Sequence, residues 1–440
     1  MHAKEVWMRT PHARRRQLVA LIALLALVVS APAAVADEHG PADDVEPGEE
    51  NDNGNGNGNG DINGDNDDEG DNNDDNGDNG DNGDNGDEEE AEEDEDASVV
   101  TRISGVNRFG TSVALSEHTH EDGADHVFVT TGGAFADALT GAPAAAAADA
   151  PVLFAPPGNL SVHGVADRIE ALGPETVTVL GGQSAVSPRI ADQLEDIDGV
   201  EDVTRLAGDD RFETAVAVSQ ETHVDADVDT VVLATGGRFP DALAGGPLAA
   251  AEEAPILLTS AGELPEVTAD ELAELEPDTV IALGGPGALD DEVLDEAVEA
   301  AGDAESIRLG GDDRFETAVE VSVYLSEEHG EPDTAYVATG VGWADAVVGA
   351  AAAGADAAPA LLVTPGQIPD ATADELERLD LEEVVVLGGP RAITERVGDA
   401  IAEILQRDDD EDDENGDDED EDEDEEDEDD EDDEDDNGDE

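Results

Sequence analysis

The chain is 440 residues long and carries 118 Asp and Glu against 18 Lys and Arg, a formal net charge of −100. This imbalance excludes nucleic-acid phosphate and anionic membrane surfaces as ordinary partners. Cysteine is absent, which excludes disulfides, thiolate catalysis, cysteine-based zinc sites and a lipid-modified cysteine anchor.

Residues 1–36 have the organisation of a cleaved export signal. Arg14-Arg15-Arg16 precedes the apolar run Leu18 to Val29, and the small residues Ala34-Val35-Ala36 follow before Asp37. The last two arginines also fit twin-arginine export, with an ordinary secretory signal as the alternative. Because no later run reaches the roughly 18 apolar residues of a spanning helix, we expect no transmembrane anchor in the remainder.

Two acidic tracts flank an apolar middle. Residues 37–97 contain 28 Asp and Glu, and residues 408–440 contain 29. Both tracts have too few apolar residues to offset chain entropy, so we predict disorder in both. The C-terminal tract is by default a solvated, self-repelling tail, although such a tail can attract Ca²⁺ or basic partners. The middle, 98–407, has 13 Arg, no Lys and a net charge of −47.

The middle consists of three copies of one unit. A motif R-x-x-G-x-x-R-F begins at residues 102, 205 and 308, so the copies are 103 residues apart. A Thr-Gly pair at 131, 235 and 339 is followed by Asp-Ala, and a Gly-Gly pair at 181, 284 and 388 closes each set. We place the copies at 98–200, 201–303 and 304–407.

The second copy shows the element pattern of all three. Short apolar runs predict strands over 204–206, 231–235, 255–259 and 279–283. Helical spacing predicts helices over 212–222, 240–251, 267–275 and 290–300. Strands that alternate with helices indicate an α/β fold with a parallel sheet covered on both faces. With about four strands each, we expect three α/β domains that own separate cores and are joined by short links.

Glycines and acids mark two turns of each copy. Gly284-Gly285 follows a strand, where nucleotide folds bind phosphate, but no copy has a complete phosphate-binding motif and the mature chain has no Lys. A tight turn that requires Gly is the favoured interpretation. Asp137, Asp241 and Asp345 stand near the start of Ala-rich segments, where a carboxylate caps a helix. Pairing with an Arg or lining of a ligand groove is the alternative.

Arginine is the most informative residue type in the middle segment. Six of its 13 arginines occupy the two fixed positions of the repeated motif, namely Arg102, Arg108, Arg205, Arg211, Arg308 and Arg314. The planar guanidinium suits carboxylate, phosphate or sulfate. Two interpretations stay open: internal Arg–Asp bridges that tie the motif to the Asp-bearing turns, or binding of an anionic polymer.

Other candidate sites are weak. His118, His120 and His126 occur only in the first copy and lack acids at a metal-site spacing, so we predict no metal site. Asn159 begins an Asn-Leu-Ser sequon in a Pro/Gly-rich loop, a candidate N-glycosylation site. No pair of acids, nucleophile or cofactor motif stands out, so we predict neither a cofactor nor catalytic residues.

The three landmarks together resemble the cell wall-binding repeat type 2 family, and the match covers all three copies. The resemblance implies Rossmann- or Toprim-like α/β domains in a pseudo-threefold module. It also implies noncovalent retention at the cell envelope, with the six arginines and the three Asp turns as binding positions. The third copy departs from the others, because Trp343 replaces Phe135 and Phe239.

The expected function is therefore that of an exported, non-enzymatic envelope protein. Its predicted partner is an anionic envelope polymer or surface-layer glycan. A structural spacer or adhesion module whose arginines only brace the fold is the main alternative, and an amidase-like wall hydrolase accessory is a third. Loss of Lys with gain of Asp and Glu is typical of proteins in multimolar salt, so we expect a halophilic archaeal source and monovalent counterions.

Overall fold

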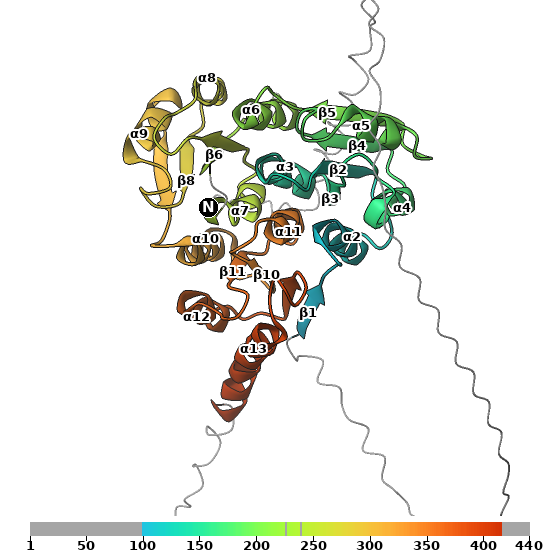
Figure 1. Ribbon diagram of the computed structural model, residues 1–440. Coiled ribbons are helices and arrows are strands. Elements are labelled where there is room, and N and C mark those ends of the chain that lie inside the picture. The colour runs from blue at the N-terminus through green and yellow to red at the C-terminus, as the bar shows by residue number, and fades with distance from the viewer. Residues whose placement is uncertain (1–98, 225–226, 238–239, 416–440) are drawn as a thin grey trace, which may run out of the picture. The chain divides into compact units, whose positions relative to one another are not determined.

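The computed structural model describes residues 99–224, 227–237 and 240–415. These residues form three similar α/β units, each with its own sheet and helices (Figure 1). The predicted signal peptide 1–36, the acidic tract 37–97 and residues 416–440 lie outside the described residues. No helix of the described ranges is long and apolar enough to cross a membrane.

Each copy contributes four strands in the predicted order. The elements of the first copy are β1 (Val99–Ile103), α2 (Arg108–Thr119), β2 (His126–Thr131), α3 (Ala136–Ala147), β3 (Val152–Ala155), η1 (Val162–Gly164), α4 (Val165–Leu172), β4 (Thr176–Leu180) and α5 (Pro188–Glu195). Those of the second are β5 (Asp202–Leu206), α6 (Arg211–Thr222), β6 (Thr230–Thr235), η2 (Pro240–Ala242), α7 (Gly245–Ala251), β7 (Ile256–Thr259), α8 (Glu266–Leu275), β8 (Thr279–Leu283) and α9 (Asp291–Ala300). Those of the third are β9 (Glu305–Leu309), α10 (Arg314–His329), β10 (Thr334–Thr339), α11 (Ala344–Ala355), β11 (Ala360–Val363), α12 (Asp370–Arg378), β12 (Glu383–Leu387) and α13 (Glu395–Asn415).

The strands form three parallel four-stranded sheets that cross the boundaries between copies. Their strand orders are β3-β2-β4-β5, β7-β6-β8-β9 and β1-β12-β10-β11. The first strand of each copy therefore completes the sheet of the copy before it, and β1 closes the ring by pairing with β12, Val99 opposite Glu383. The predicted parallel α/β class is confirmed, and each sheet combines three strands of one copy with the first strand of the next. A crossover such as β4-α5-β5 delivers the next strand to the adjacent edge of the same sheet, and the chain moves to the next copy only afterwards.

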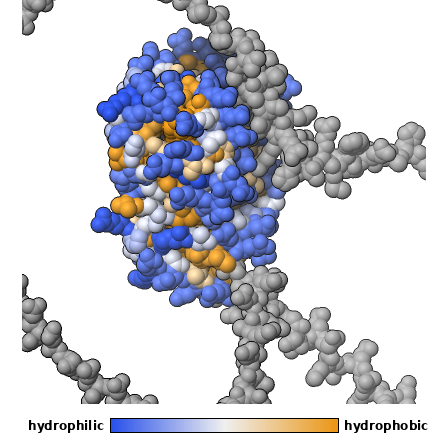
Figure 2. Space-filling view, turned by 90° about the vertical axis from the view of Figure 1, so that its right-hand side faces the viewer, coloured by the Kyte–Doolittle hydropathy of each residue, from blue (hydrophilic) through white to orange (hydrophobic). Residues whose placement is uncertain are grey.

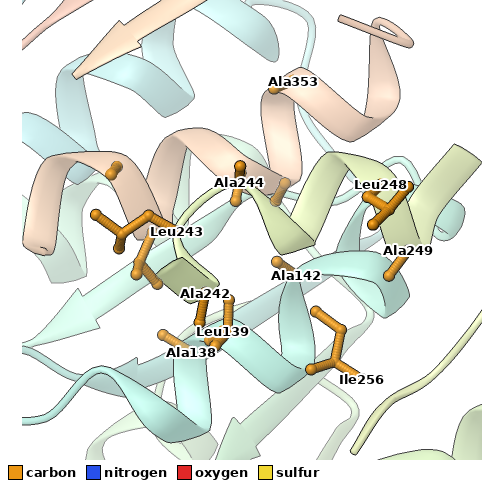
Figure 3. Close-up of a cluster of buried hydrophobic side chains, with 14 of the residues drawn as sticks. Ala138, Leu139, Ala142, Ala242, Leu243, Ala244, Leu248, Ala249, Ile256 and Ala353 are labelled. Carbon is orange, nitrogen blue, oxygen red and sulfur yellow. The ribbon is translucent and has the colours of Figure 1, made fainter. Parts of the chain in front are cut away.

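The cores also differ from three separate ones. Each sheet buries one face in a local cluster, but the opposite faces share one large cluster that contains residues of all three copies. In that cluster α3, α7 and α11 pack against one another, with Ala142, Leu243 and Leu248 among the buried side chains (Figure 3). A Cβ on Gly246 would lie 2.5 Å from the Cβ of Ala350 and 3.3 Å from that of Ala142. Ala and Gly are frequent in these helices because three backbones approach closely there.

Two helices differ from their predicted bounds. The segment 240–251 divides into the short η2 and α7, with Leu243 and Ala244 between them. Helix α13 extends to Asn415, eight residues into the tail predicted to be disordered from 408. Its preceding turns template further backbone hydrogen bonds, since helix extension costs less than nucleation.

The ring closure predicts a local effect of changing β1. Thr101→Pro removes a backbone donor from the strand that covers the β12 edge. We expect faster hydrogen exchange in β12, with smaller changes in β4 and β8, whose edges are covered by β5 and β9. Exchange measured by mass spectrometry after proteolysis tests this, and unchanged protection of β12 would contradict the closure.

Candidate binding junctions between the repeats

Three equivalent junctions form where consecutive copies meet. Each brings together the Gly-Gly turn and the Asp of one copy and the arginine motif of the next. At the junction of copies 2 and 3, a Cβ on Gly285 would lie 3.5 Å from the Gly311 carbonyl oxygen. We call the three sites junctions 1/2, 2/3 and 3/1.

The first arginine of each motif donates hydrogen bonds to the neighbouring copy whose sheet its strand completes. Arg308 donates to the carbonyls of Gly284 at 2.8 Å and Leu289 at 3.1 Å, and pairs with Asp291 at 3.1 Å. Arg205 donates to the Gly181 carbonyl at 2.6 Å. Arg102 donates to the carbonyls of three residues after β12 and lies 3.8 Å from a Glu395 carboxylate oxygen; the three are Gly388, Ile393 and Thr394. The first position is therefore a brace between copies.

The second arginine holds the Thr-Gly turn of its own copy. Arg108, Arg211 and Arg314 each donate to the carbonyl of the turn glycine, which is Gly132, Gly236 or Gly340. The turn needs Gly because the Arg side chain and the following Phe lie against it; a Cβ on Gly132 would be 2.6 Å from the Phe109 ring. Arg108 and Arg211 are exposed, so this position keeps access to solvent.

The Asp of each copy lies over its own Gly-Gly turn. A Cβ on Gly181 would be 2.4 Å from Asp137 Oδ2, and Gly181 itself has φ of 98°, so Gly is required there twice over. Burial raises the pKa of Asp137, and Arg211 of the next copy partly offsets this. Burial likewise raises the pKa of Asp345, against a hydrogen bond with Thr111 and the charge of Arg108.

A threonine that belongs to the repeated motif, and to which the sequence alone assigned no role, links the two sides. The Thr317 hydroxyl accepts from the Gly311 N–H at 3.2 Å and lies 3.1 Å from Asp241 Oδ1 across junction 2/3. Thr111 and Thr214 accept in the same way from Gly105 and Gly208. Its constant place, three residues after the second arginine, was the signal that could have found it.

These contacts test the roles that the sequence suggested for the arginines and for the three Asp residues. The structure brings together the Asp and arginines as expected, but the arginines donate mainly to backbone carbonyls. Among the described residues, no carboxylate lies within ion-pair distance of Arg108, Arg211 or Arg314. Side-chain capping by Asp137 and Asp345 is wrong, because Phe135 and Trp343 occupy the N-cap positions. Each Asp does lie in the first turn of its helix, where a carboxylate complements the helix dipole.

Junction 3/1 contains an aromatic contact of its own. The Arg108 Cζ lies 5.1 Å from the centroid of the Trp343 ring, within cation–π range. Phe154 packs edge-on against the same ring, with centroids 5.7 Å apart. Trp343 therefore orients the guanidinium of the one second-position arginine that belongs to the first copy.

The remaining candidates lie apart from the junction contacts. In the described part of the chain no group of three His, Asp or Glu is arranged to hold a metal ion. His126 donates to or accepts from Thr178 at 2.8 Å, and burial lowers its pKa to about 4. Asn159 is exposed, and its side chain accepts from the Ser161 N–H at 3.2 Å. N-glycosylation at Asn159 stays a prediction.

Loss of a first-position arginine should weaken the fold. Arg308→Ala removes bonds to two carbonyls and a carboxylate, and the side chain is only 20% exposed. We expect a loss of about 1.5–3 kcal/mol in the free energy of unfolding, as for hydrogen bonds from charged groups. Urea unfolding measures it, with the exposed Arg189→Ala as a control expected within about 0.5 kcal/mol of wild type. Equal effects of the two substitutions would contradict the brace.

The buried carboxylate predicts a pH-dependent effect. Because the folded pKa of Asp345 is raised, its ionised form opposes folding above the unfolded pKa. Asp345→Asn should therefore increase the free energy of unfolding near neutral pH, and the gain should shrink as pH falls toward 3.8, the ordinary pKa of an Asp side chain. Paired urea titrations across pH test this, and a loss of stability at neutral pH would show that the charge is needed.

The comparisons with known proteins converge on the repeats. The family described as cell wall binding domain 2 (CWB2) matches residues 102–191, 205–294 and 308–398. The N-acetylmuramoyl-L-alanine amidase LytC of Bacillus subtilis (strain 168) is 26% identical over 303 residues, 69% of this chain and 58% of LytC. The amidase enhancer of the same organism is 24% identical, over 70% of this chain and 40% of its own length.

Solved structures agree with the fold. Cwp6 from Clostridium difficile superposes with a TM-score of 0.65 and 25% identity, over 70% of this chain and 48% of Cwp6. Cwp8 from the same organism gives a TM-score of 0.60 and 27% identity, over 70% of this chain and 52% of Cwp8. This chain thus spans about half the length of these relatives. With three tandem copies matched over most of its described residues, the chain belongs to the cell wall binding domain 2 (CWB2) family.

Proposed function

We propose that this protein is exported and attaches noncovalently, without enzymatic activity, to an acidic polymer of the cell envelope. The observation that carries the proposal is the threefold convergence of a Gly-Gly turn, a carboxylate and two arginines at the junctions. A family of cell wall binding domains supports the class of target. Export rests on the predicted signal peptide in residues 1–36, which are outside the described residues.

The geometry favours attachment over catalysis. The same contacts are repeated at three junctions, which is expected of a multivalent binding module and not of a single active site. Arg108 and Arg211 donate to backbone carbonyls and are nevertheless exposed, so they can also contact a ligand. The relatives named as amidase and amidase enhancer match through the binding repeats. Figure 2 shows hydrophilic residues around separate hydrophobic patches on one face. Loss of Lys and the −47 charge of the middle support work in concentrated salt with monovalent counterions.

One observation favours a second function, that of a structural spacer or adhesion module. Arg102, Arg205 and Arg308 all bond to backbone carbonyls of the neighbouring copy, which is the bracing that this alternative requires. Bracing and binding are separable, because the first position braces the neighbouring copy while the second position remains partly accessible.

Co-sedimentation tests the attachment. The full-length protein is mixed with envelope fragments of the producing organism in multimolar salt, where screening over about 3 Å removes nonspecific charge effects. We expect saturable sedimentation, release by guanidinium without enzymatic digestion, and no new amino groups or reducing ends. A spacer without envelope affinity would stay in the supernatant, and release of wall fragments would indicate a hydrolase.

A further inference from the structure

The three junctions share one scaffold but carry different charges. Besides the repeated Asp, which every junction contains, the segments 102–111 and 388–396 of junction 3/1 contain four arginines and one acid, Glu395. The same segments of the other two junctions are counted in the same way. Junction 1/2, formed by 205–214 and 181–189, contains three arginines and three acids. Junction 2/3, formed by 308–317 and 284–292, contains two arginines and six acids. In a chain this acidic, an arginine-rich site at one junction alone is a specific feature.

We propose that junction 3/1 is the binding site for a glycan bearing carboxylate or phosphate groups, and that junctions 1/2 and 2/3 serve the fold. This inference rests on the proposed envelope attachment and names its site and ligand class. It separates junctions that the repeat pattern alone would treat as equal.

Exposed residues of the arginine motif account for part of the difference in charge between the junctions. The second and third copies have the exposed pairs Asp209-Asp210 and Asp312-Asp313 directly before the second arginine. The first copy has Val106 and Asn107 there, and Val106 is fully exposed. The fold does not require the acids, because Asn107 caps its helix as Asp210 and Asp313 cap theirs, through the same two backbone N–H groups.

The segment after the Gly-Gly turn also makes junction 3/1 more basic than junction 2/3. After β12 the chain carries the exposed Arg391 and Arg396, whereas the corresponding stretch after β8 carries Asp290, Asp291 and Glu292. Asp291 pairs with Arg308 at 3.1 Å, and the equivalent Glu395 lies 3.8 Å from Arg102. The first arginine is therefore paired at both junctions, and the difference in charge comes from Arg391, Arg396 and the acids around the second arginine. The interaction between two charges weakens with distance, and salt screens the distant charges. Neighbouring carboxylates therefore affect an arginine more than the acids elsewhere on the chain do.

Apolar surface at junction 3/1 suits a sugar. Trp343 belongs to the Thr-Gly turn of the third copy and lies under Arg108, an arrangement in which one end of the site is aromatic and the other charged. Val341, on the same turn, is 62% exposed, and Val106 faces solvent on the opposite segment. An anionic glycan offers both C–H faces for this surface and acidic groups for the arginines.

Matched variants of the full-length protein test the site with envelope fragments of the producing organism in multimolar salt. Arg108→Ala and Arg314→Ala each remove a bond to the Thr-Gly turn of their own copy, and Arg108→Ala also removes the contact with Trp343. The melting temperature of each variant is therefore measured beside its affinity. We expect about a tenfold loss of affinity for Arg108→Ala and less than about twofold for Arg314→Ala. The double variant Val106→Asp/Asn107→Asp, which copies the other two motifs, should also lose about tenfold while keeping its melting temperature.

The outcomes separate the two levels of the proposal. Equal losses for Arg108→Ala and Arg314→Ala, or wild-type affinity of the double variant, would overturn the site while leaving envelope attachment intact. Failure of wild type to sediment would overturn attachment itself. Amidation of envelope carboxylates and hydrofluoric-acid removal of phosphodiesters identify the anion, and undiminished binding after both treatments would overturn an anionic ligand.

Discussion

The structure depends on a strand that each copy gives to the copy before it. β5 and β9 complete the sheets of the first and second copies, and β1 completes that of the third. Near the end of each of these strands stands the first arginine, whose guanidinium reaches the carbonyl of the neighbouring Gly-Gly turn. The turn glycines have φ between 93° and 103°, a backbone conformation that favours glycine. Strand exchange and arginine thus fix the same interface.

This interface also explains why residues 98–407 contain arginine but no lysine. An ammonium is a compact, strongly hydrated charge, whereas the guanidinium presents several donors in one plane. Arg308 uses that geometry to reach two carbonyls and a carboxylate from one half-buried position. Surface charge on this chain is almost entirely acidic, so cations remain chiefly where they hold specific acceptors. The composition therefore reflects both solvent and architecture.

The sequence was sufficient for the elements and not for their assembly. Period and landmark residues predicted the strands near 231–235 and 279–283 and the parallel α/β class, and these are confirmed. The pairing of β1 with β12 spans the whole repeat region, and no local pattern encodes it. Likewise the motif located all six arginines but not their acceptors. Every residue has a backbone carbonyl, so the sequence does not indicate which carbonyls accept from an arginine. The capping role of Asp137 failed because a buried carboxylate over Gly181 has the same local pattern as a cap.

Ring closure has a consequence for how such a site can evolve. Every junction is made of two copies, so a single repeat cannot contain one, and a change in one motif affects the site shared with the preceding copy. At junction 3/1 the two halves come from opposite ends of the repeat region, with Arg102 bonding to residues 286 to 292 positions away. The two segments of each junction belong to that junction alone, so their charges can differ from those of the other junctions while the shared Gly, Arg and Thr contacts keep the same scaffold. The repeat pattern therefore specifies the fold three times, and the residues that depart from it, Val106, Asn107 and Trp343, distinguish the proposed binding site from the other two junctions.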